Sequence, residues 1–413
     1  MLNDDNWHAA PVLIFGLMNR FVALFRSDEF VVYPELATAD EASDVLYRAS
    51  FYLPNHRIYY AAPEAFALKR PEYFAENFAL SANITRVSLA SLIKKIITVK
   101  NVLVTSPRGP GQLMRMFHRL SNINYVDRLR YRGEAAAYYH AYNYSNHGTP
   151  PSAYLDVESL PKREFAFVFG SGPSLDTAYQ YDFGRVSAYK IICNSLVKNK
   201  RLLDHIRPDF VVCADAALHF GPSVYASTFR SDLVSYLKDT PACKLLIPET
   251  YNPYFREHVY SGANVYTIPC LTEKSFNVDL RALYAVHDHG SILNRLQLPL
   301  ASTLSDRVLL LGYDGRSKKD QSVDMKYWAA HSTDSNYTEL IGTLFEAHPY
   351  LPAIDKDAYA AQVAEKTEKI ISLGEQAGKE YLCINESSIP ALQSRQAPAA
   401  LRQMLTPGVL TGR

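Results

Sequence analysis

A glycine-containing loop follows a short apolar segment in the middle of the chain. Residues 165–169 are Phe-Ala-Phe-Val-Phe, and the next six are Gly170, Ser171, Gly172, Pro173, Ser174 and Leu175. Glycines permit a sharp turn close to a ligand, and the first free N–H groups of a following helix favour a phosphate. The loop is neither a Walker sequence nor a complete dinucleotide fingerprint, because both need residues that are absent here. A tight turn that binds nothing is the alternative.

Polar residues also follow the next two apolar segments. Asn194 comes after residues 189–193, and Asp215 comes after residues 210–214. If these segments are parallel strands, their carboxyl ends share the sheet edge at which open α/β sheets bind ligands. A carboxylate there can attack the anomeric carbon of a sugar, or it can cap a helix or bind a hydroxyl. Both interpretations of Asp215 stay open.

A lone histidine is the candidate for acid and base chemistry. His331 stands in Ala-Ala-His-Ser-Thr-Asp, and imidazole suits a catalytic base because its pKa lies near neutral. A core or capping histidine is the alternative. Residues 287–289 are not expected to bind a metal, since adjacent side chains cannot all face one ion. The Asp-x-Asp at 355–357 is interpreted as a helix start. The sequence therefore requires no metal and no cofactor.

The elements that must position these residues are those of an α/β fold. Short apolar segments alternate with helix-like stretches in both halves, which favours parallel sheets. The segments expected to be strands are 29–33, 57–60, 101–105, 165–169, 189–193, 210–214, 244–247, 265–268, 307–311 and 381–384. A helix is expected over 357–373.

The length of 413 residues predicts two domains. Residues 138–162 have the Tyr, Asn, Pro, Gly and Ser content of a linker. We therefore expect an N-terminal domain over 1–160, a second domain over 161–395, and a weakly ordered tail at the C-terminus, over 396–413. Glu134 and residues 106–111 are candidates for the acceptor side.

Charge and composition narrow the partners and the location. The 43 Lys and Arg nearly balance the 42 Asp and Glu, so nucleic acid is not an expected partner. Five cysteines without a Cys-x-x-Cys pair fit a reduced, cytoplasmic setting. The apolar segment 11–25 is too short and interrupted to span a bilayer and is interpreted as a core helix. Peripheral association with the inner face of a membrane stays open.

The order of these motifs resembles a known family. Gly-Ser-Gly-Pro-Ser-Leu at 170–175, Cys-Asn at 193–194, Leu-Gly-Tyr-Asp at 311–314, the isolated His331 and Asn-Glu-Ser-Ser at 385–388 resemble the bacterial sialyltransferases of glycosyltransferase family 42. The resemblance covers most of residues 164–392. It implies a CMP-activated acidic sugar as the donor and His331 as the catalytic base.

The same resemblance assigns donor-binding roles to ten residues. It implies that Asn194 lies beside the cytidine or the donor sugar, that His289 and Ser291 belong to a turn that opens a helix near the phosphate, and that Asn385 and Ser387 contribute from the C-terminal segment. The nucleotide itself would be lined by Gly170, Ser171, Gly172, Pro173 and Ser174.

The first 160 residues have no counterpart in family 42. Two Rossmann-like domains facing across a cleft resemble a variant of the glycosyltransferase B architecture and the retaining β-Kdo transferases of glycosyltransferase family 99. This resemblance implies transfer of Kdo, an acidic 2-keto sugar, to a bacterial surface glycan acceptor. Asp215 would take the sugar covalently with assistance from His331.

Three alternatives stay open. The first is an inverting sialyltransferase or another nonulosonic acid transferase of the same fold. The second is a pterin diphosphokinase with a similar loop, which would need ATP and a metal. The third is a non-catalytic nucleotide-binding module within a larger multi-domain enzyme.

Overall fold

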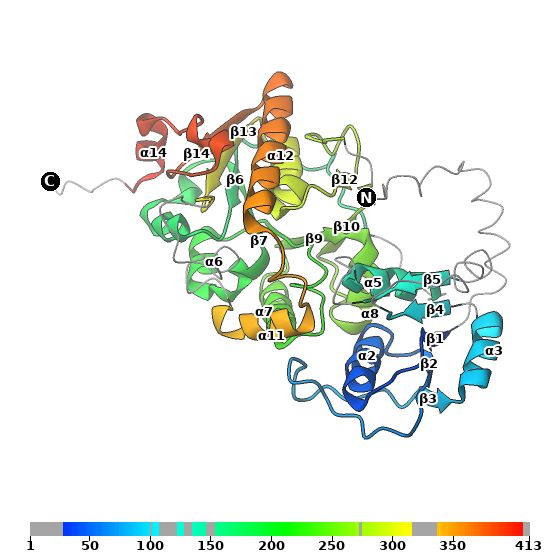
Figure 1. Ribbon diagram of the computed structural model, residues 1–413. Helices are drawn as coiled ribbons and strands as arrows, with labels where there is room; N and C mark the ends of the chain where they lie inside the picture. The colour runs from blue at the N-terminus through cyan, green and yellow to red at the C-terminus, as the bar shows by residue number, and fades with distance from the viewer. Residues whose placement is uncertain are drawn as a thin grey trace. The chain divides into compact units, whose positions relative to one another are not determined.

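The computed structural model describes residues 28–99, 101–106, 122–127, 134–145, 153–271, 275–315 and 337–407. The chain divides into two compact units. The first consists of residues 1–71, 79–127 and 137–149, and the second of residues 72–78, 128–136 and 150–413. Each unit is built on a parallel sheet (Figure 1).

The sheet of the first unit has five parallel strands in the order β3-β2-β1-β4-β5. Helices α2 (Ala39–Tyr52) and α3 (Leu89–Val99) cover opposite faces of this sheet (Figure 1). The strand order reverses between β1 and β4, as in a Rossmann fold. The strands are β1 (Glu29–Tyr33), β2 (Arg57–Ala61), β3 (Ile84–Val87), β4 (Asn101–Val104) and β5 (Asn122–Tyr125).

The sheet of the second unit has seven parallel strands in the order β10-β9-β8-β7-β6-β13-β14. Every residue of β6 is buried, as expected for a central strand with helices on both faces. The order reverses between β6 and β13. The strands are β6 (Phe165–Phe169), β7 (Ala188–Cys193), β8 (Phe210–Val212), β9 (Lys244–Pro248), β10 (Val265–Ile268), β13 (Arg307–Leu311) and β14 (Glu380–Cys383).

Helices and short segments complete the second unit. A two-stranded sheet pairs β11 (Cys270–Leu271) with β12 (Val286–His287). The long helix α12 begins after Asp355, whose carboxylate accepts from the N–H groups of Asp357 and Ala358 at 3.0 Å, so the predicted helix start is confirmed. The α-helices are α6 (Lys200–Ile206), α7 (Val224–Asp239), α8 (Asn252–His258), α9 (Leu298–Leu304), α11 (Ile341–Ala347), α12 (Lys356–Gln376), α13 (Pro390–Gln393) and α14 (Ala399–Leu405).

The predicted α/β fold class is confirmed, and two strands of the first unit were missed. Strands β3 and β5 have the sequences Ile-Thr-Arg-Val and Asn-Ile-Asn-Tyr, and most of their side chains are not fully buried. They end the sheet on either side, where a strand needs no continuous apolar sequence. Part of the predicted linker is helix α5 (Glu134–Ser145), because its tyrosines are core residues: Tyr138 stacks on Tyr52 at 4.5 Å.

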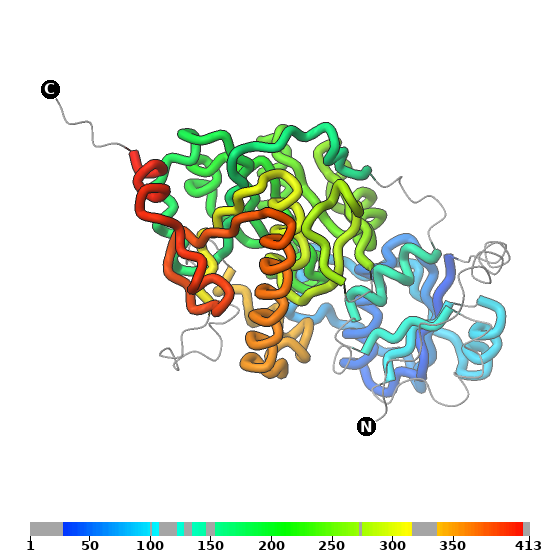
Figure 2. The backbone as a smooth tube through the Cα atoms, turned by 90° about the horizontal axis from the view of Figure 1, so that it is seen from above, coloured from blue at the N-terminus to red at the C-terminus, as the bar shows by residue number. Residues whose placement is uncertain are grey.

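The C-terminal segment is ordered as far as the structure describes it, through residue 407, so the prediction of a weakly ordered tail is wrong there. Helix α14 buries Leu401 and Leu405, and the Leu405 carbonyl accepts from the N–H of Asp182 at 2.8 Å. Burial of these two leucines holds the short helix in place although the segment has no long apolar pattern. Figure 2 follows this segment, in red, along the outer side of the second unit.

We predict that Gly374→Ala destabilises the second unit, because an added Cβ would overlap the buried Tyr381 hydroxyl, which bonds Ser302 at 2.8 Å. The expected loss is about 1–3 kcal/mol in the free energy of unfolding, measured by urea denaturation. Gly342→Ala in α11 is the matched control, because nothing lies within 4 Å of its added Cβ. That variant should be neutral or more stable. Equal effects of the two substitutions would contradict this packing.

Candidate functional site

Two loops meet at the switch point of the seven-stranded sheet, which is the place between β6 and β13 where the strand order reverses. Strands β6 and β13 are neighbours, with Phe169 opposite Leu311. After these strands, the N–H of Gly170 donates to the Leu311 carbonyl at 2.8 Å, and the N–H of Gly172 donates to the Gly312 carbonyl at 2.9 Å. A Cβ at Gly170 would overlap the Gly312 carbonyl. The close approach of the two backbones therefore explains why positions 170 and 172 are glycine.

Asp314 occupies the position predicted for an anionic ligand. Its carboxylate accepts from the N–H of Ser174 at 3.2 Å and from the Ser174 hydroxyl at 2.9 Å. A 3-10 helix over Pro173–Gln180 begins there. The N–H groups of Gly170, Gly172 and Ser174 thus donate within the protein. The sequence had led us to expect free N–H groups in this loop, and that expectation is wrong for these three. Nucleotide binding by this loop, including Ser171 and Pro173, stays a prediction.

The next strand places an amide with an unmet hydrogen bond at the same edge. Asn194 follows β7 with φ of +50°, in the left-handed region that few residues other than glycine adopt. Its Oδ1 is buried and has no partner among the described residues. An unsatisfied buried acceptor in a strained residue marks a functional candidate. Asn194 lies after β7, as predicted, and its contact with a ligand stays a prediction.

A glutamine that sequence reasoning missed ties the two loops together. Gln297 is fully buried; its Nε2 donates to the Phe169 carbonyl at 3.0 Å, and its Oε1 accepts from the Tyr313 hydroxyl. It ends a π-helix over Leu293–Gln297. Pro299 supplies no N–H for the α-helical bond to the Arg295 carbonyl, which favours the wider turn. A proline inside an apolar helical stretch was the available sequence signal.

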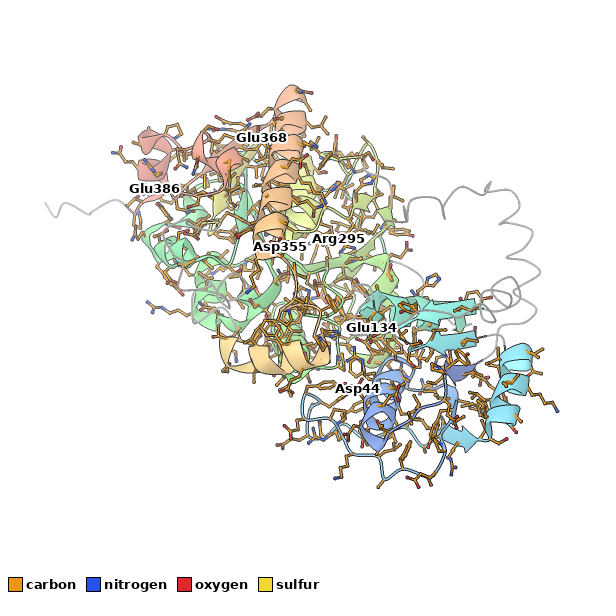
Figure 3. The ribbon with its side chains drawn as sticks, in the orientation of Figure 1. Asp44, Glu134, Arg295, Asp355, Glu368 and Glu386 are labelled. Atoms are coloured by element: carbon orange, nitrogen blue, oxygen red, sulfur yellow. The ribbon has the colours of Figure 1, made fainter. Side chains whose placement is uncertain are left out.

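Arg295 brings a largely buried cation to the carboxyl edge of the sheet, with its side chain 16% exposed (Figure 3). Its guanidinium donates to the Ala214 carbonyl at 3.2 Å and to the Cys270 sulfur at 3.1 Å. The Asp288 carboxylate lies 3.8 Å away. Nε is buried and without a hydrogen-bond partner in the described parts of the chain. Sequence reasoning missed Arg295 because nothing in its neighbourhood identifies it.

Asp215 follows β8 and is exposed. Its Oδ1 accepts from the N–H groups of Ala217 and Leu218, both at 2.8 Å, and so holds a turn over residues 216–220 where the alternative interpretation expected a helix. Its own N–H donates to His219 Nδ1 at 3.0 Å, and burial lowers the pKa of that histidine to about 4. Oδ2 makes no hydrogen bond to any described residue. One oxygen is therefore fixed while the other can reach a ligand.

Asn385 and Ser387 lie at the loop junction, as predicted from the C-terminal segment. The Asn385 Oδ1 accepts from the N–H of Gly312 at 3.1 Å, and the Ser387 hydroxyl donates to the Tyr313 carbonyl at 2.6 Å. Both side chains hold the loop that carries Asp314. Their position fits the prediction, whereas direct contact with a nucleotide stays untested.

His289 and Ser291 form the predicted turn before a helix. Ser291 Oγ accepts from the N–H of Asn294 at 3.3 Å at the start of the helical segment. The His289 ring stacks on Phe276 at 4.1 Å, and its Nε2 bonds the Ser275 carbonyl at 2.9 Å. Burial lowers the pKa of His289, so its neutral form is favoured. His289 therefore offers no positive charge to a phosphate at neutral pH.

The remaining candidates are His331, Glu134 and residues 106–111. His331 and residues 107–111 lie outside the described residues, and the Ser106 carbonyl accepts from the Tyr125 hydroxyl at 2.8 Å. Glu134 is fully buried with its carboxylate 3.4 Å from His348 Nδ1, so it is not an accessible acceptor contact.

The described residues contain neither a cluster of metal ligands nor a membrane-spanning helix. In those parts of the chain no group of three or more His, Cys, Asp or Glu is placed to hold a metal ion. No described helix is long and apolar enough to cross a membrane, and segment 11–25 falls outside this description.

The chain shows little similarity to known proteins. No family model matches the sequence, and no curated protein matches it. Among solved structures, the sialyltransferase CstII from Campylobacter jejuni in complex with cytidine-5'-monophosphate is similar, with a TM-score of 0.26 and 11% identity. The match covers 60% of this chain and 95% of that chain. A likeness this weak carries no conclusion about function, and the fold class rests on the two sheets.

We predict that Asp314→Asn changes how stability depends on pH. Burial raises the pKa of the Asp314 carboxyl above its unfolded value of 3.8, although hydrogen bonds from Ser174 oppose this effect. The folded state therefore binds more protons than the unfolded state between the two pKa values, and wild type loses stability as pH rises through that window. The variant lacks this loss. Urea denaturation of both proteins from about pH 3 to about pH 7 tests it.

The stability difference between the two proteins should shift in favour of the Asp314→Asn variant as pH rises. A shift in favour of wild type would mean that the Ser174 hydrogen bonds outweigh burial and that the carboxylate is stabilised at the loop.

Proposed function

We propose that this chain is a glycosyltransferase that moves an acidic 2-keto sugar from a CMP donor to a glycan acceptor. The observation that carries the proposal is the buried, unpartnered Oδ1 of Asn194 beside the two glycine loops at the switch point. Open α/β sheets bind nucleotides at this position. The amino group of cytosine, or a sugar hydroxyl, can donate the hydrogen bond that the Asn194 oxygen lacks.

Positive charge for the donor comes from Arg295. A guanidinium matches the planar oxygens of a phosphate or a carboxylate, and the donor carries both. CMP leaves with less charge than a nucleoside diphosphate, so one cation and a few hydrogen-bond donors suffice without a metal. Ser174 joins this set when the Asp314 carboxylate releases its N–H and hydroxyl.

The favoured reaction is transfer of Kdo with retention of configuration. Asp215 Oδ2 attacks the anomeric carbon, the bond to the CMP oxygen breaks, and CMP leaves with the bonding electrons. An acceptor hydroxyl then attacks the same carbon, loses its proton to a base such as His331, and releases the Asp215 carboxylate. The sugar and the retention follow from the sequence resemblance alone. The inverting alternative needs no covalent step.

We predict that CMP raises the thermal unfolding temperature without magnesium and that Asn194→Gly weakens this effect. Glycine keeps the left-handed backbone of Asn194 while removing its side chain. One lost hydrogen bond to the ligand corresponds to about tenfold weaker binding. The measurement is a thermal-shift titration with CMP, CDP, UDP, ATP and NAD, with and without magnesium.

Asn277→Gly is the matched control, because Asn277 bonds the Leu283 and Ala285 carbonyls and lies in a different loop. Its CMP affinity should equal that of wild type. Stabilisation by ATP only with magnesium favours the diphosphokinase alternative. No stabilisation by any nucleotide would rule out the donor site.

We predict a covalent sugar adduct on Asp215. Wild type incubated with CMP-Kdo and no acceptor should gain the mass of one Kdo residue in intact mass spectrometry, and Asp215→Asn should not. The variant should keep CMP affinity within about threefold, because Asn retains the Oδ1 that caps Ala217 and Leu218. Turnover that yields an inverted anomer by NMR, with no adduct, would establish direct displacement instead.

A further inference from the structure

Helix α3 of the first unit carries an apolar stripe that the described residues leave uncovered. Leu89, Ile93 and Ile97 are spaced four residues apart, and their exposed fractions are 45%, 44% and 55%. The neighbouring face of the helix buries Leu92 and Ile96 against the sheet. The apolar sector of α3 is therefore wider than its packing on the sheet requires.

Figures 1 and 2 both show α3 at the outer side of its unit. A contiguous apolar face of this kind, exposed among the described residues, marks an interaction surface.

The sequence around this helix is strongly basic. Between Asn77 and Val126 the chain has seven Lys and Arg and no Asp or Glu, which leaves 36 basic and 42 acidic residues elsewhere. Lys94 is exposed on α3, and Arg86 is exposed on the edge strand β3. Lys95 is held by the Glu29 carboxylate at 3.4 Å and lies over the Tyr59 ring. The Arg86 guanidinium donates to the Ala62 and Pro63 carbonyls, both at 3.2 Å, so among the described residues Lys94 is the exposed cation of α3 that makes no ion pair.

We propose that α3 binds the surface of a bilayer that contains anionic lipids. Isoleucine and leucine enter the boundary of the acyl chains, while the flanking Lys94 and Arg86 meet the headgroups. Nucleic acid would use the charge but not the apolar stripe. A second copy of the chain would bring two basic segments together. A lipid surface uses both properties, and this inference does not depend on the chemistry of the second unit.

The test is co-sedimentation of the full chain with vesicles of phosphatidylcholine and phosphatidylglycerol. Wild type should bind these vesicles and bind phosphatidylcholine alone at least tenfold less. Replacing Ile93 and Ile97 together by Ser should lower binding about tenfold or more. Lys94→Glu should lower it about tenfold and make the remaining binding less sensitive to salt.

The matched control replaces Leu283 and Leu373 by Ser, because these leucines are exposed to 47% and 37% in the second unit. The control should bind vesicles as wild type does, and unfolding curves should show that all variants fold. Equal losses in control and test variants would overturn the proposal, as would absence of vesicle binding. Binding of DNA through Lys94 without the isoleucines, or a dimer that Ile93→Ser and Ile97→Ser dissociate, would overturn it in favour of another partner.

Discussion

The second unit depends on the close approach of two backbones where β6 and β13 end. Gly172 donates to the Gly312 carbonyl at 2.9 Å, and a side chain at Gly170 or Gly172 would overlap the opposite loop. This contact fixes both loops at the point where the order of parallel strands reverses. The glycines are therefore required by the fold itself, whether or not a phosphate binds between them.

Side chains from three distant segments lock this junction. Gln297 reaches Phe169 and Tyr313, Ser387 bonds the Tyr313 carbonyl, and Asp314 holds Ser174. Buried polar contacts of this kind are strong only when each partner is satisfied. Asn194 Oδ1 and Arg295 Nε break that rule at the same sheet edge, within the described residues. Their unmet hydrogen bonds distinguish the edge near β7 and β8 from the fully bonded loop after β6.

The two units have different surfaces. In the second unit, the candidate site lies at the carboxyl edge of the seven-stranded sheet, where the neighbouring strands β6, β7 and β8 end. In the first, the feature without a partner in the described structure is the outer side of α3, with Ile93 and Ile97 beside Lys94. A donor site on one unit and a lipid-binding face on the other would suit an enzyme whose acceptor is attached to a membrane.

The sequence by itself determined the α/β class and the central strands. Continuous apolar segments such as 165–169 and 307–311 can only be buried between two layers of helices, and both are strands as predicted. It also placed Asn194 and Asp215 correctly at strand ends, because parallel strands share one carboxyl edge. It did not identify β3, β5 or helix α5, since edge strands and tyrosine-rich helices lack the periodic apolar pattern of core elements.

Only the tertiary structure decided which polar groups already have partners. The amides of Gly172 and Ser174 look free in the sequence, but Gly312 and Asp314, about 140 residues away, accept their hydrogen bonds. Arg295 and Gln297 lie in a π-helical turn that precedes Pro299, and although this proline signals the turn, it does not show which side chains meet the sheet edge. Hydrogen bonds between distant segments depend on how the sheet brings them together. Local sequence therefore specified the strands and their polar ends, and long-range packing specified which of those ends is open to a ligand.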